Sequence, residues 1–455
     1  MRNVVPTSVR RWKKGVAVMG EGQSPRAGID RKAVAELGTE VLDWRHKAVP
    51  AALHGRTAAE FGSGSVRLSD LQTPLLTLDD AALRGNVAKL AAWCERHGVR
   101  LAPHGKTTMA PALWAAQLEA GAWGITLANA AQLRVARRFG VEVLMLANSL
   151  TDPQAIGWVA GQVAGGARIV SWVDSVAGVR RLQDVLDAAD AGPLEVLVEI
   201  GGHGGRTGAR GVDAALEVAQ AVRAASRLRL GGVSGYEGAL SHSWDEAGLA
   251  PVRAYLNDFR RLHERLAADG GYDTDEVILT AGGSAYFDDV VEILGPCAAP
   301  GVEVILRSGA YVIHDDGFYR GISPFSRQNP DAEDAFVSAM HGWARVVSRT
   351  EPGLAILEGG KRDLPVDEGL PVPQGIAREL GAPLQPLAGA RITAVNDQHA
   401  FLAYPAEVDV RPGDVVRLGL SHPCTALDKW TLMPVLDGTA DPANPSVVGT
   451  VRTFF

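Results

Sequence analysis

The chain has 455 residues, of which 46% are hydrophobic, so it is long enough to bury a large core and to form more than one domain. Its formal net charge of -7 arises from 52 acidic and 45 basic residues mixed along the chain, which excludes the basic face of a nucleic-acid-binding protein. Three scattered cysteines are too few for a disulfide framework, so we expect a reducing compartment, with the cytoplasm as the location.

The first 70 residues give no firm secondary-structure pattern, and we expect a partly ordered extension there. Residues 1–20 include basic side chains, but the apolar run from Val16 to Met19 is shorter than a signal peptide requires, so no export is expected. No apolar stretch approaches the ~20 residues that a membrane-spanning helix needs, and no membrane partner is expected.

Residues 71–98 are expected to lead into the main domain as one strand and one helix. The apolar run at 73–79 predicts a strand, and Asp79 or Asp80 is a suitable N-cap for a helix that continues to about Arg96. This strand is not one of the eight predicted barrel strands that follow it.

Residues 99–320 alternate short apolar runs with longer stretches of helical period, such as 211–226 and 251–269, which is typical of repeated βα units. Eight such units close an α/β fold of the TIM type, a (β/α)8 barrel. The predicted strands are residues 99–103, 124–129, 143–148, 168–174, 194–200, 228–236, 276–281 and 302–307.

After the barrel the pattern changes to short strands separated by proline and glycine. We expect a separate C-terminal β domain over 321–455, with its boundary near residues 321–329. Its predicted strands are residues 344–348, 354–357, 391–395, 415–420 and 446–452.

The first barrel strand runs into His104, Gly105 and Lys106, which places an amine at the face where barrels carry their active sites. A lysine that is partly desolvated there has a lowered pKa and can form a Schiff base. A solvated loop lysine is the alternative interpretation of this motif alone.

The seventh barrel strand runs into Gly282, Gly283 and Ser284, just before a helix. Backbone amides in such a turn can bind an anion, and barrels often bind phosphate after strands seven and eight, although an ordinary glycine turn fits equally well. A phosphate site combined with a Schiff-base lysine indicates a cofactor with both an aldehyde and a phosphate. Pyridoxal 5'-phosphate has both groups.

Two further strand ends carry polar side chains that could contact this cofactor. Strand five ends in a glycine-rich loop with His203 and Arg206, and Arg206 could stabilise the phenolate oxygen of the cofactor. Strand six ends at Tyr236, whose hydroxyl could contact the ring or its nitrogen. As isolated features, His203 and Tyr236 are more often loop or packing residues.

In the β domain, His422 and Cys424 stand two residues apart, on the same side of an extended chain, as two ligands of one ion would. Two protein ligands leave room for water or substrate, which suits a catalytic zinc site and not a structural one. A buried free cysteine beside a loop histidine is the alternative. His399 belongs to a second polar cluster, and its role as ligand, base or surface residue stays open.

These residues, in this order, resemble the fold-type III, alanine racemase-like pyridoxal-phosphate family, in the branch of D-serine dehydratase and D-threonine aldolase. The resemblance covers roughly residues 71–455 and depends most on the PHGKT motif around Lys106 and on SHPCTALDKW around the His422 and Cys424 pair. It implies a homodimer with active sites at the interface and a strand at 73–79 that packs on the β domain. It also implies that Arg206 and Tyr236 contact the cofactor, and that its phosphate is bound by Gly282, Gly283 and Ser284.

The resemblance implies a pyridoxal-phosphate- and metal-dependent lyase, with Lys106 as the cofactor lysine and as the base for the Cα proton. The aldolase branch has an aspartate where this chain has Cys424, and the dehydratase branch has a cysteine. We therefore expect a D-serine dehydratase-like enzyme that converts a D-β-hydroxy amino acid to a 2-keto acid and ammonia, with zinc on His422 and Cys424.

The alternatives are an aldolase acting on D-threonine or 3-hydroxy-D-aspartate, a metal-free racemase, and a non-catalytic pyridoxal-phosphate-binding protein. The His422 and Cys424 pair argues against the racemase. D-serine, D-threonine and D-3-hydroxyaspartate all stay open as substrates.

Overall fold

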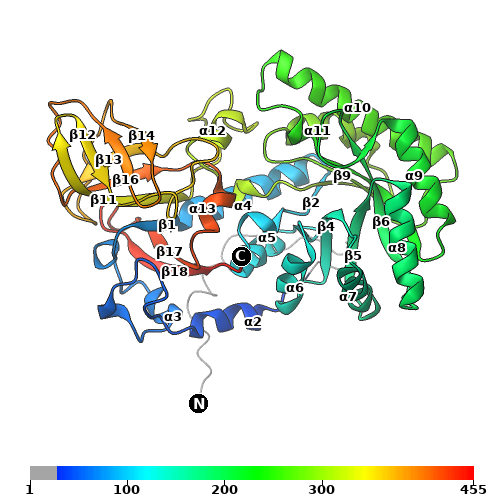
Figure 1. Ribbon diagram of the computed structural model, residues 1–455, viewed down its shortest axis with the longest axis horizontal. Helices are drawn as coiled ribbons and strands as arrows, with labels where there is room; N and C mark the ends of the chain where they lie inside the picture. The colour runs from blue at the N-terminus through cyan, green and yellow to red at the C-terminus, as the bar shows by residue number, and fades with distance from the viewer. Residues whose placement is uncertain (1–27) are drawn as a thin grey trace.

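The computed structural model describes residues 28–455, and residues 1–20, for which no export signal is expected, lie outside this range. A β domain forms one end of the molecule and an α/β barrel forms the other, with the long helix α4 (Asp80–Arg96) beside their junction (Figure 1). Among the described helices, none is long and apolar enough to cross a membrane.

All eight strands that the sequence predicts for the barrel are present and parallel, in the order β2, β10, β9, β8, β6, β5, β4, β3. A bridge between His104 and Thr126 joins the two ends of this row and closes the barrel. The TIM-barrel prediction is confirmed. The strands are β2 (Arg100–Leu101), β3 (Ile125–Leu127), β4 (Val143–Ser149), β5 (Arg168–Val173), β6 (Leu194–Gly201), β8 (Leu228–Gly235), β9 (Val277–Ala281) and β10 (Val302–Leu306).

Helices cover the outside of the barrel, and polar caps begin several of them. Side chains of Asn129, Asp152, Ser175 and Asp245 each accept an amide hydrogen bond in the first turn of the helix that follows. The helices are α5 (Pro111–Glu119), α6 (Ala130–Arg138), α7 (Pro153–Ala164), α8 (Val176–Ala188), α9 (Val212–Ala224), α10 (Glu246–Ala268) and α11 (Phe287–Leu294), with the short α12 (Phe318–Ile322) after the last strand.

Side chains from all around the barrel form a separate hydrophobic cluster. Because the strands contribute them in turn, they make the barrel a filled core and not a channel. The members are Ala102, Trp123, Met145, Val170, Trp172, Leu197, Ile278 and Ile305.

The β domain contains the five strands that the sequence predicts and three more. The additional strands are β13 (Val372–Ala377), β15 (Ala400–Ala403) and β17 (Leu432–Asp437). β13 and β17 each contain a proline, and β15 has only four residues, so none of them shows a clear strand pattern. The predicted strands are β11 (Met340–Glu351), β12 (Leu354–Leu357), β14 (Arg391–Val395), β16 (Val415–Gly419) and β18 (Ser446–Arg452).

The strand expected before the barrel, β1 (Leu75–Asp79), belongs to the sheet of the β domain. It pairs antiparallel with β11 and parallel with β17. The Asp79 side chain then accepts the amide of Ala82 at 2.7 Å and caps α4, which ends at Arg96 as predicted. From β1 onward, the chain therefore runs from the β domain through the barrel and back to the β domain.

Residues 28–70 form their own small elements, with α2 (Arg31–Glu36) packed against the barrel helix α5 and α3 (Ala58–Phe61) packed on β18 of the β domain. Thr57 and Glu60 form a capping box on α3, and Phe61 is 1% exposed. Phe61 belongs to a hydrophobic cluster that this segment shares with β-domain residues such as Trp343 and Val447. The extension is thus folded from residue 28 onward, first against barrel helices and then, from Leu42, against the sheet of the β domain.

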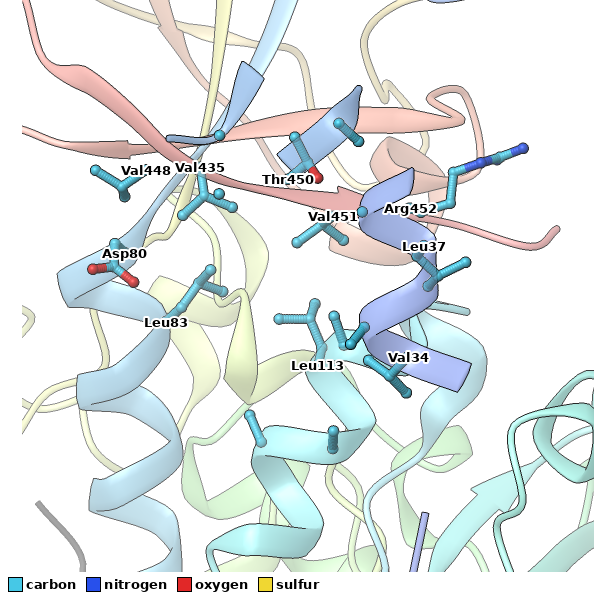
Figure 2. A pocket seen from close by; sticks show the side chains of 18 of the residues that line it. Val34, Leu37, Asp80, Leu83, Leu113, Val435, Val448, Thr450, Val451 and Arg452 are labelled. Atoms are coloured by element: carbon cyan, nitrogen blue, oxygen red, sulfur yellow. The ribbon is translucent and has the colours of Figure 1, made fainter. Parts of the chain in front are cut away.

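Helix α2 lies beside a mostly apolar cavity of about 160 Å³ between α5 and the strands β17 and β18 (Figure 2). Its lining includes Val34, Leu113, Val435 and Val451, and an ion pair between Arg31 and Glu119 lies at its edge. None of the site residues predicted from the sequence lines this cavity, so it is separate from the candidate site.

The barrel requires glycine at position 232 in β8. Gly232 has a φ of 151°, and a Cβ there would lie 1.9 Å from the carbonyl oxygen of Ile278 on β9.

We expect Gly232→Ala to lower the free energy of unfolding by roughly 3 kcal/mol, measured by denaturant unfolding. Gly157→Ala in α7, where nothing lies within 4 Å of the added Cβ, is the control and should stabilise by roughly 0.5–1 kcal/mol. Equal stability of the two variants would contradict the account of β8.

Candidate functional site

Lys106 lies at the C-terminal mouth of the barrel, in a 3₁₀ turn (Gly105–Thr107) that begins shortly after β2. The turn is tightly packed: a Cβ on Gly105 would lie 2.7 Å from both Trp114 and Ile125, and Trp114 Nε1 donates to Gly105 O at 3.2 Å. The fixed backbone holds the lysine stem in one place, where its amine can face the interior of the mouth.

The surroundings of Lys106 lower the pKa of its ammonium. Burial is the largest cause, the positive charges of Arg206 and Arg307 act in the same direction, and Cys424 opposes them. Within residues 28–455 the Lys106 amine has no hydrogen-bond partner. An amine that is less basic and free of partners is suited to covalent attachment of an aldehyde.

Arg206 and Tyr236 lie together at the mouth, since the Arg206 guanidinium is 4.8 Å from the centroid of the Tyr236 ring. The buried Tyr255 of α10 holds the ends of the two strands that carry them: its hydroxyl donates to Ile200 O at 2.8 Å and accepts the Tyr236 amide at 3.0 Å. Both predicted cofactor contacts are thereby on the same side of the barrel as Lys106. His203 is exposed in the Arg206 loop.

The glycine turn after β9 binds an anion, but the anion is a side chain of the protein. The amides of Gly282 and Gly283 donate to the two carboxylate oxygens of Glu237, at 3.0 and 2.7 Å, and Glu237 is fully buried. The Ser284 hydroxyl accepts the Ala310 amide at 3.2 Å. Within residues 28–455 the Ser284 amide has no hydrogen-bond partner, so of the three predicted phosphate donors it is the one left free in this arrangement.

Two buried charges at the mouth were not found from the sequence. Arg307, which is 6% exposed at the end of β10, donates to Thr280 Oγ1 at 2.6 Å and to Gly235 O. Glu199, at the end of β6, has one carboxylate oxygen that is buried without a partner among the described residues, and burial raises its pKa. Their position at the ends of barrel strands is the signal that could have identified both.

His422 and Cys424 come together, although not as predicted. The sequence pattern predicts both on one side of an extended chain, whereas His422 adopts a left-handed conformation with φ of 58° and Cys424 lies in the first turn of α13 (Pro423–Leu427). The turn between them brings the thiol to the imidazole, because Pro423 starts the helix and folds the chain back. The two side chains still face each other, as two ligands of one ion would.

Carboxylates from two distant loops hold His422. Asp315, which is 1% exposed, accepts the His422 amide at 2.9 Å, and Asp367 Oδ2 lies 2.5 Å from His422 Nδ1. Asp367 also accepts the Thr425 hydroxyl at 2.6 Å. Burial lowers the pKa of His422, but hydrogen bonds to Cys424 and Asp367 outweigh burial and raise it to about 9. With Nδ1 bound by a carboxylate, Nε2 is the nitrogen available to a metal.

Cys424 connects this pair with the lysine. Its thiol lies 3.3 Å from Thr107 Oγ1, the residue next to Lys106. Among the described residues no group of three or more His, Cys, Asp or Glu side chains is placed to hold an ion, so any ion on His422 and Cys424 would have positions open for water or substrate. His399 is exposed in the turn between β14 and β15.

Comparison with known sequences gives a family match and several relatives. A family model described as "Putative serine dehydratase domain" matches residues 339–436, a region that includes Asp367, His422 and Cys424. D-threonine aldolase of an Arthrobacter species is 27% identical over 356 residues, which cover 78% of this chain and 86% of that protein. D-threo-3-hydroxyaspartate dehydratase of Delftia sp. strain HT23 is 27% identical over 374 residues, which cover 78% of this chain and 92% of that protein.

Solved structures show the same architecture. D-threonine aldolase from Filomicrobium marinum superimposes with a TM-score of 0.69 and 26% identity, over 85% of this chain and 96% of that chain. An ala racemase-like protein from Idiomarina loihiensis superimposes with a TM-score of 0.66 and 17% identity, over 84% of this chain and 96% of that chain. At this identity, the likeness shows the fold alone. Together, these sequence and structural similarities support the fold-type III, alanine racemase-like family of pyridoxal-phosphate enzymes, as the resemblance in the sequence implied.

Proposed function

We propose that this protein is a pyridoxal-phosphate- and metal-dependent lyase that dehydrates a D-β-hydroxy amino acid, such as D-serine or D-threonine, to a 2-keto acid and ammonia. The observation that carries the proposal is the 3.3 Å contact between the Cys424 thiol and the Thr107 hydroxyl. It places a pair of possible metal ligands beside Lys106, so that one substrate could reach both.

The residues present fit the cofactor. Lys106 supplies an amine of lowered pKa, and in the turn after β9 the Gly282 and Gly283 amides are occupied by Glu237. The Ser284 amide stays free for a phosphate oxygen, and Arg206 and Tyr236 supply a cation and a hydroxyl at the same mouth. Such donors match the aldehyde, the phosphate and the phenolate oxygen of pyridoxal phosphate.

Lys106 would hold the cofactor and, once released by the substrate amine, take the Cα proton of the substrate. The bound cofactor supplies an electron sink for that step. Because Lys106 comes from one side of the mouth, only one enantiomer presents its Cα hydrogen to the amine. We propose that this is the D enantiomer, which is the substrate form named for the aldolase and dehydratase relatives.

His422 and Cys424 would hold a zinc ion, which supplies Lewis-acid stabilisation to the departing β-hydroxyl. An imidazole nitrogen and a thiolate are the donors that zinc prefers. A D-threo-3-hydroxyaspartate dehydratase of the same fold has been solved in a form described as metal-free, which supports a role for metal in such enzymes.

The second candidate is an aldolase that breaks the Cα–Cβ bond after removal of the hydroxyl proton. The 27% identity to D-threonine aldolase of Arthrobacter favours it. Cys424 favours the dehydratase instead, because the softer thiolate selects zinc where an oxygen ligand would select manganese or magnesium. Assay of a panel of D-β-hydroxy amino acids for keto acid and ammonia, against glycine and aldehyde, separates the two activities.

The cofactor assignment predicts that Lys106→Ala loses covalent attachment. Borohydride reduction of the wild-type protein with pyridoxal phosphate should label one peptide, the one that contains Lys106, and peptide mass spectrometry detects it. Lys106→Arg should also fail, because a guanidinium cannot take the place of the primary amine. Labelling of a different lysine in the wild-type protein would refute this assignment.

The metal assignment predicts that His422→Ala and Cys424→Ala each slow dehydration by at least about 100-fold, since loss of a Lewis acid removes several kcal/mol of stabilisation from the departing hydroxyl. Exchange of the Cα proton in deuterated water, which depends on Lys106, should continue. The matched control is Cys297→Ala, which removes a free thiol that precedes β10, at the opposite end of the barrel strands from the mouth, and should leave both rates unchanged. Full dehydration by metal-free Cys424→Ala protein would contradict the role of the ion.

We also propose that the protein is a cytoplasmic homodimer. Arg206 is exposed and Tyr236 is 37% exposed at the mouth of a single chain, so a second copy could cover them. Analytical ultracentrifugation of the cofactor-loaded protein should give twice the chain mass of 48.0 kDa, and a monomer at micromolar concentration would overturn this proposal.

A further inference from the structure

Lys47 lies in the N-terminal segment, outside the part of the chain that resembles the family. Its ammonium nevertheless contacts the β domain at three points. Nζ donates to Arg362 O at 2.8 Å and to Asp363 Oδ1 at 3.0 Å, and it lies 4.7 Å from the centroid of the Trp430 ring. The proposed function gives this lysine no role.

Asp363 is a buried charge that depends on Lys47. Its side chain is 4% exposed, and Lys47 is the one cation that forms an ion pair with it among the described residues. Its other oxygen accepts hydrogen bonds from neutral groups, Gln398 Nε2 at 2.9 Å and the Gly360 amide at 3.3 Å. Without the ammonium, a buried carboxylate would be left with neutral donors alone, which is costly.

Asp363 is the base of the loop that carries Asp367. Residues 363–365 are buried, and the chain becomes exposed at Asp367, which binds His422 and Thr425. Pro365 fixes its own φ between these points. The position of Asp363 therefore constrains the position of Asp367 in this loop.

Trp430 connects Lys47 with the other side of the metal pair. It follows α13, the helix that contains Cys424, and is 1% exposed. Its Nε1 donates to Asp363 O at 2.9 Å. The Lys47 ammonium thus contacts both the loop whose Asp367 orients His422 and the segment that follows α13, the helix of Cys424.

The segment around Lys47 is itself held firmly. Glu40 accepts a hydrogen bond from Arg452 Nε at 2.8 Å, and its other oxygen lies 3.2 Å from His46 Nε2. Leu42 is fully buried. Lys47 therefore extends from a fixed backbone and not from a free tail.

We propose that residues 40–50, here called the strap, position the metal pair, and that Lys47 is the positioning residue. The proposal rests on the proposed function in one respect, the presence of a metal on His422 and Cys424. Residues that orient a metal ligand typically change metal affinity 10–100-fold when removed. Lys47 acts one contact further away than Asp367, so we expect an effect of about tenfold.

The test measures zinc affinity of the full-length, cofactor-loaded protein by competition with a chromophoric chelator, together with amide hydrogen exchange. Lys47→Met keeps the apolar stem and removes the charge. It should weaken zinc binding about tenfold and speed exchange in peptides that cover residues 358–370. Lys47→Arg retains the charge and the contact with the Trp430 ring, and should restore both values to within about threefold of wild type.

The matched control is Arg67→Met. Arg67 ties the same N-terminal segment to the β domain, through Asn444 O at 2.9 Å and Asp441 at 3.4 Å, but it contacts neither the Asp363 loop nor Trp430. This variant should leave zinc affinity and exchange in 358–370 unchanged.

The proposal is wrong if Lys47→Met protein has the zinc affinity and the hydrogen exchange of the wild type. It is also wrong if exchange in this variant speeds up by the same factor throughout the chain. If the wild-type protein binds no zinc at His422 and Cys424, the metal part of the proposed function fails. In that case exchange in 358–370 still decides whether Lys47 holds the loop.

Discussion

The contact between Cys424 and Thr107 is the constraint on which the rest of the site depends. It spans two domains, because Thr107 follows the first barrel strand and Cys424 lies near the end of the chain, 317 residues later. A thiol at this place can serve chemistry at Lys106 only if the β domain docks on the barrel mouth in one orientation. Loss of that orientation would separate the two halves of the site.

Several features fix the docking. One continuous hydrophobic cluster extends from barrel residues such as Leu101 to β-domain residues such as Trp430. The Phe454 amide donates to Met109 O at 2.9 Å, which ties the end of the chain to the lysine segment. Asp315, just after the barrel, accepts the His422 amide. Figure 1 shows the outcome, with α13 placed between the sheet of the β domain and the barrel.

The barrel could be predicted because its strands are apolar runs separated by helical periods, and the position of Lys106 at the barrel mouth could be predicted because it follows shortly after one of those strands. The pair His422 and Cys424 is visible as a local motif. Their partners were not predictable, since Asp367 and Asp315 come from loops 55 and 107 residues away and have no pattern of their own. The Glu237 carboxylate in the glycine turn was missed for the same reason: 45 residues separate it from Gly282.

The most direct test is a crystal structure of the protein with pyridoxal phosphate and zinc, with anomalous diffraction measured at the zinc edge. The account predicts one anomalous peak about 2.0–2.1 Å from His422 Nε2 and about 2.3 Å from Cys424 Sγ, and cofactor density continuous with the Lys106 side chain. A zinc peak at other residues, or cofactor attached elsewhere than Lys106, would contradict the claim that the two domains form one catalytic site.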